Sequence, residues 1–140
     1  MKKNNLMTAG GICLLVLSAA ASLGTHFLFH ACGPKEDGSY MTCHYAQSAS
    51  EGTAVVLAVL ALLLLISKSR SAMKAYAAAM VPVSVLMILI PNTLIPLCMM
   101  PDMRCRSVMR PAVLVIGILI LLISAVLALV PAKERGADSV

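Results

Sequence analysis

The sequence has little charge and few aromatic side chains. Only 12% of its 140 residues are charged, it has no tryptophan, and it has two phenylalanines and three tyrosines. A soluble domain of this size carries about 25% charged residues, so the shortage of charge excludes an ordinary soluble fold. The net charge is +5. A nucleic-acid interface needs a basic folded surface, usually with stacking aromatics, so we expect no nucleic-acid partner.

Catalytic motifs are missing as well. The sequence has no Walker-type phosphate loop, no H-E-x-x-H zinc motif and no G-x-S-x-G nucleophile elbow. The chain is therefore not predicted to be an enzyme of any class that these motifs identify.

Long apolar runs are what the sequence does contain. Hydrophobic residues make up 60% of the chain, and a helix needs about 20 apolar residues to cross roughly 30 Å of hydrocarbon. The runs predict an all-α membrane protein, one domain over residues 1–140 in which four transmembrane helices joined by short loops form a bundle. The predicted spans are residues 6–29, 46–67, 75–95 and 110–130.

The first run has a competing interpretation. Lys2 and Lys3 precede it, and Ala19-Ala20-Ala21 imitates the cleavage site of a secretory signal peptide. The apolar core of a signal peptide is about 7–15 residues long, whereas this run continues well beyond that length. We therefore expect the first run to remain as a transmembrane helix.

Basic residues and cysteines fall unevenly on the two sides of the predicted bundle. Seven basic residues lie at the termini and between spans two and three, against four in the other two loops. Basic loops stay on the cytoplasmic side, so both termini are predicted to be cytoplasmic. The less basic, extracytoplasmic loops contain four cysteines, namely Cys32, Cys43, Cys98 and Cys105.

These four cysteines predict structural disulfides. Pairing Cys32 with Cys43 encloses ten residues and pairing Cys98 with Cys105 encloses six, although four cysteines allow three connectivities. Each bond would stabilise the fold by about 2–4 kcal/mol. The alternative is a small membrane thiol–disulfide or quinone oxidoreductase. His44 follows Cys43, and Arg104 and Arg106 flank Cys105, so neighbouring cations would favour a thiolate. The C-x-x-C pair usual in such enzymes is absent.

Histidine and methionine near the same loops offer a further alternative. His26 and His30 are four residues apart on one helix face, and His44 and Met41 lie near the start of span two. Sulfur with imidazole suits copper(I), zinc or a haem. Methionine is also a common apolar filler, so no cofactor is our leading expectation.

Glu51 is a carboxylate at the outer end of span two. An ionisable group at membrane depth indicates a partner of opposite charge. Arg104 and Arg106 lie on the same predicted side, and we expect one of them to pair with Glu51.

The two cysteine-containing loops resemble a family. The matching stretches are Cys32-Gly33-Pro34, Asp37-Gly38-Ser39, Met41-Thr42-Cys43-His44-Tyr45, residues 90–101 and Met103-Arg104-Cys105. They are similar to an uncharacterised four-span family, the domain of unknown function 4418. The resemblance implies a bacterial cytoplasmic membrane protein and association with exporter-type ATP-driven (ABC) permeases, and it implies no activity. Our leading hypothesis is an accessory or interaction subunit of a membrane complex, with a disulfide-stiffened outer cap.

Overall fold

The computed structural model describes residues 2–28, 33, 35–40, 42–91, 93–96, 99–100, 102 and 105–130, apart from the side chains of 2–4 and Cys105. Its long helices are α1 (Lys2–Leu23), α2 (Thr42–Ile66), α3 (Arg70–Leu89) and α4 (Arg110–Leu129). Short π-helical turns, η1 (Gly24–Leu28) and η2 (Cys105–Met109), follow α1 and precede α4. Four segments are long and apolar enough to cross a membrane, and the described part contains no strand. The prediction of an all-α, four-helix membrane bundle is confirmed, and the protein is a multi-pass membrane protein.

Helix α3 differs most from its predicted span, because it starts at Arg70 instead of 75 and ends at Leu89 instead of 95. Ser69, with an extended backbone, lets the helix begin within the basic segment. Proline has no backbone N–H and clashes with the preceding turn, so it bends or ends a helix. Helix α3 continues through Pro82 but ends before Pro91. The chain turns at Pro91, where Leu94 and Ile95 donate to the carbonyls of Leu89 and Ile90.

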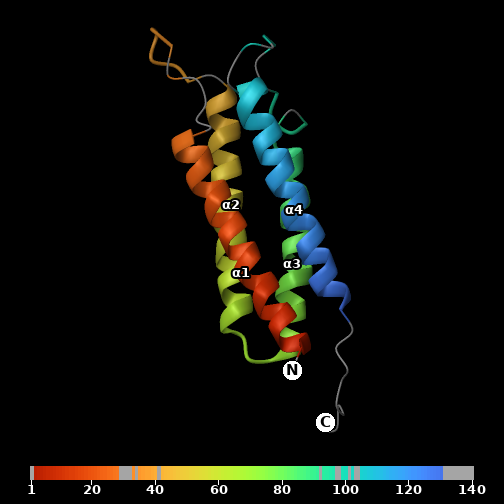
Figure 1. Ribbon diagram of the computed structural model, residues 1–140. Coiled ribbons are helices and arrows are strands. Elements are labelled where there is room, and N and C mark those ends of the chain that lie inside the picture. The colour runs from red at the N-terminus through yellow and green to blue at the C-terminus, as the bar shows by residue number, and fades with distance from the viewer. Residues whose placement is uncertain are drawn as a thin grey trace.

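The four helices form a ring in chain order (Figure 1). Helix α2 packs against α1 and α3, α3 packs against α4, and α4 closes the ring against α1 along a less extensive contact. We call one end of the bundle the basic end, because it contains the start of α1, the 67–69 connection with Lys68, and the end of α4 (Figure 1). The opposite end, with η1, η2 and the longer connections, is called the loop end.

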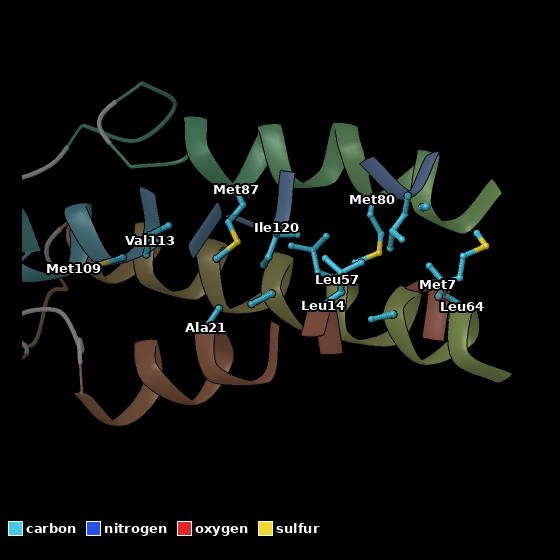
Figure 2. Close-up of a cluster of buried hydrophobic side chains, with 14 of the residues drawn as sticks. Met7, Leu14, Ala21, Leu57, Leu64, Met80, Met87, Met109, Val113 and Ile120 are labelled. Atoms are coloured by element: carbon cyan, nitrogen blue, oxygen red, sulfur yellow. The ribbon is translucent and has the colours of Figure 1, made fainter. Parts of the chain in front are cut away.

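A continuous apolar core runs between the two ends. Met7 and Leu64 lie at the basic end of this core, and Met109 and Val113 lie at the loop end (Figure 2). Apolar burial does not drive association of helices within lipid, so dispersion at close contact stabilises the bundle. Gly117 permits such contact, since a Cβ there would lie 2.7 Å from Cγ1 of Ile88 on α3.

The core also contains hydroxyl side chains that bond within their own helices. Ser18 donates to the Leu14 carbonyl, Ser84 to the Val81 carbonyl at 2.7 Å, and Ser124 to the Leu121 carbonyl at 3.0 Å. Such bonds satisfy a hydroxyl that has no water to bind. Ser50 of α2 is fully buried, and its Oγ has no hydrogen-bond partner in the structure.

Candidate functional site

An open groove lies between α1 and α2 on the surface that faces lipid. We call it the α1–α2 groove; its volume is about 320 Å³, and its lining is almost entirely apolar. The lining residues recur at helical spacing, so each helix contributes one face. They are Leu15, Ala19, Ser22 and Leu23 of α1 with Val55, Ala58, Val59 and Leu62 of α2.

Small side chains create this groove. Ala19, Ser22 and Ala58 are half-buried, whereas Val55, Val59 and Leu62 are more exposed along its edge. Small residues on a lipid-facing surface let the backbone of a second helix approach closely, which strengthens dispersion between the helices. The groove can therefore accept large apolar side chains that project from a membrane-embedded ligand.

A titratable pair lies about one helical turn beyond the groove, toward the loop end. Nδ1 of His26 is 3.3 Å from Oε1 of Glu51. The two side chains form an ion pair when the imidazole is protonated. The side chains are 58% and 34% exposed, so the pair lies at the edge of the bundle and not in its core. The imidazole also meets the ring of Phe27 edge-on, with 4.8 Å between the centroids.

This pairing gives Glu51 a neighbour that the sequence did not predict. The structure places His26 beside the carboxylate, whereas Nη1 of Arg106 donates to the Met99 carbonyl at 3.4 Å. Arg104, the other predicted partner, lies outside the described residues. Glu51 remains exceptional, because it is the single acidic residue in the described helices and π-helical turns.

The π-helical turn η1 fixes the position of His26. Thr25 within it is buried, and its hydroxyl lies 2.9 Å from the Ala21 carbonyl and 3.0 Å from the Ser22 carbonyl. Nε2 of Gln47 on α2 donates to the Thr25 carbonyl at 3.0 Å. A π-turn is a rare widening of a helix that is frequent at functional sites. Here the widened turn is tied to α2, which brings His26 toward Glu51.

The structure describes the side chains of two of the five cysteines, Cys13 and Cys43. Cys43, in the first turn of α2, is fully buried and disulfide-bonded, whereas Cys13 is free. Cys32 and Cys98, as well as the side chain of Cys105, lie outside the described part. The connectivity of the four loop cysteines therefore stays a prediction.

The predicted metal ligands are only partly described. His44 stacks on Tyr40, with 4.2 Å between the centroids and 19° between the planes. His30 and Met41 lie outside the described residues. Within the described ranges, no three histidine, cysteine or acidic side chains come together as metal ligands. The described site thus consists of an apolar groove beside one His–Glu pair.

Comparisons with known proteins give one match. Residues 14–130 match the model of a family described as a domain of unknown function (DUF4418). No curated protein and no solved structure matches the chain.

Proposed function

We propose that this chain, which belongs to the family of unknown function that its residues 14–130 match, is an accessory subunit that binds another membrane protein. The ligand would be a transmembrane helix of the partner, seated in the α1–α2 groove. The observation that carries this proposal is the groove itself, an apolar concavity of about 320 Å³ that ends near the one carboxylate of the described helices.

The chemistry of the groove defines the partner helix. Its half-buried alanines would accept leucine, isoleucine or phenylalanine side chains, and its apolar edge would exclude a polar ligand. Glu51 would favour a lysine or arginine near the end of the partner helix. A charged pair at the membrane boundary aligns two helices along their axes, because a shift by one turn separates the charges.

The loop end would serve as a rigid cap. The sulfur of Cys43 is fully buried, so a thiolate from a redox partner has no access to it, which favours a structural disulfide over a catalytic one. Since Cys13 is free, the disulfide partner of Cys43 would be Cys32, Cys98 or Cys105. We propose Cys32 as that partner and a second bond between Cys98 and Cys105.

The proposed location is the bacterial cytoplasmic membrane, with the loop end outside and the basic end in the cytoplasm. Lys68, Arg70 and Lys74 at the basic end support this orientation. The proposed partner class is the permease of an ATP-driven exporter, which the family resemblance suggests.

A matched pair of substitutions tests the proposal. Ala58→Leu fills the groove, whereas Ala79→Leu makes the same change at an exposed position on α3, away from the groove. The tagged variants would be purified in mild detergent from the native membrane, with mass spectrometry and an ultraviolet–visible spectrum on each sample.

We expect a stoichiometric membrane protein to accompany the wild-type chain and Ala79→Leu, and to be lost from Ala58→Leu. Retention of the partner by a folded Ala58→Leu variant would contradict the groove as the binding site. A Soret band or bound metal without a protein partner would contradict the accessory role and favour the metal or haem alternative.

A further inference from the structure

The outward face of α4 has the shape that the α1–α2 groove can accept. Large apolar side chains recur along this face at the helical spacing of a single stripe. We call the stripe the α4 ridge; its members are all exposed, and they are Val115, Ile118, Leu119, Leu122 and Val126. The opposite face of α4 is packed in the core. Small side chains hollow the groove and large ones build the ridge, so the two surfaces are complementary in shape.

The charges at the loop end differ between the two sides of the bundle. On the α1–α2 side, the described residues comprise three carboxylates and one lysine, namely Glu36, Asp37, Glu51 and Lys35. On the α3–α4 side, they comprise two arginines and one carboxylate, namely Arg106, Arg110 and Asp102. The turn at residues 35–40 and the start of α4 lie apart at this end (Figure 1). The acidic side of one copy therefore complements the basic side of another.

These charges distinguish α4 from α3 as a ligand for the groove. Arg106 lies in η2 and Arg110 is the first residue of α4, so both are at the loop end. Helix α3 reaches the loop end at Leu89, and the described residues that follow it up to 96 include no basic residue. Two copies inserted in the same orientation have their loop ends at the same membrane boundary. The arginines of one copy are then at the same boundary as the carboxylates of the other.

We infer that the α1–α2 groove of one copy binds the α4 ridge of a second copy. The ridge would pack over the alanines of the groove, while the arginines at its outer end would face the acidic side of the neighbour. The contact joins two different surfaces, so it is heterologous and the copies associate head to tail. The inference rests on the groove of the proposed function and adds a regulation to it. A second copy would fill the groove until a partner helix displaces it.

Disulfide cross-linking in native membranes tests this contact. One tagged chain contains Val55→Cys in the groove, and a co-expressed chain with a different tag contains Leu122→Cys on the ridge. Both contain Cys13→Ala, which removes the exposed free thiol, and the Cys13→Ala chain alone controls for the loop cysteines. Leu57 lies somewhat nearer the basic end than Ile120 (Figure 2), so Val55 and Leu122 lie at similar depths. Copper phenanthroline then oxidises thiols that are close together.

We expect a disulfide-linked dimer from the co-expressed chains and none from either chain alone, because a heterologous contact brings the groove to the ridge and not to itself. The depth control is Val115→Cys, on the same ridge but about 10 Å nearer the loop end. It should cross-link to Val55→Cys at least about tenfold less. A cross-link from either chain alone, or equal cross-linking through Val115→Cys and Leu122→Cys, would overturn the inference.

Further substitutions separate the apolar and charged parts of the contact. Ala58→Leu fills the groove and should abolish the cross-link. Arg110→Gln should lower the cross-linked fraction about two- to fivefold, since a partly exposed charge pair contributes up to about that factor. Lys74→Gln, which removes a cation at the basic end, should leave it unchanged. Equal loss in Arg110→Gln and Lys74→Gln would contradict the charge complementarity.

The same preparations distinguish this inference from the proposed function. Leu122→Ala should weaken self-association and retain the partner protein, whereas Ala58→Leu should lose both. A partner that co-purifies with a chain that shows no cross-link would overturn the inference and leave the proposed function standing. A cross-link without any co-purifying membrane protein would support the inference and contradict the proposed function.

Discussion

The contact between α3 and α4 at Gly117 allows one substitution to be worked out in detail. A Cβ at this position would lie 2.7 Å from Cγ1 of Ile88, about 1 Å closer than carbon atoms normally approach. Overfilling a packed core costs about 1–3 kcal/mol. Replacing a helical glycine with alanine gains about 0.5–1 kcal/mol. We expect Gly117→Ala to lower the free energy of unfolding by about 1–2 kcal/mol.

Gly52 offers a matched control in α2. A Cβ there meets nothing within 4 Å, so Gly52→Ala should retain the propensity gain without a clash. Unfolding by sodium dodecyl sulfate in mixed micelles, followed by circular dichroism, measures both variants. Ile88→Ala, which removes the clashing Cγ1, should restore part of the loss when combined with Gly117→Ala. Equal stability of Gly117→Ala and Gly52→Ala would refute the claim that the two helices are in close contact at Gly117.

Four further predictions concern the ends of the bundle and its buried polar groups. Asp37→Cys should react with an impermeant maleimide in intact cells and Arg70→Cys should not, in a background without native thiols; the reverse pattern would invert the proposed topology. Cys43 should resist alkylation until the protein is denatured and reduced, and titration of this bond near −200 mV would favour the oxidoreductase alternative. Glu51→Ala should cost less than about 1 kcal/mol, because the pair is partly exposed; a loss of about 3–5 kcal/mol would indicate a desolvated pair. Ser50→Ala should not destabilise the protein, since the Oγ that it removes is buried without a partner; a loss above about 1 kcal/mol would show that this hydroxyl is hydrogen-bonded.

The number and approximate position of the helices could be predicted from the sequence, because a run of apolar residues has few alternatives in a chain with so little charge. Helix ends were harder to predict. Hydropathy continues past Pro91, and the apolar pattern alone does not show that the backbone turns there. At the other end of α3, the basic residues from Arg70 onward belong to the helix although they are too polar for the predicted span.

The site was less predictable. Glu51 stood out in the sequence as a carboxylate at the edge of an apolar span, but the sequence did not predict His26 as its neighbour, because arginine carries a permanent charge and is the more obvious partner of a carboxylate. The position of His26 depends on η1, and a single widened turn has no sequence signature. The groove combines residues from two helices, α1 and α2, that lie more than thirty positions apart in the sequence. Which helices are neighbours is a tertiary property that hydropathy does not encode.

The ring order of the helices has a consequence for biosynthesis. Helices α1, α2 and α3 each pack extensively on the next helix in the chain, so each new span can dock on the one before it as soon as it leaves the insertion machinery. The contact between α4 and α1 must wait for the last span, and it is the less extensive one. At this contact, a Cβ on Gly10 of α1 would lie 2.9 Å from Leu127 of α4, so closure brings a bare backbone against a leucine. A nascent chain that has not yet inserted α4 therefore exposes this strip of α1 to lipid until the last span arrives.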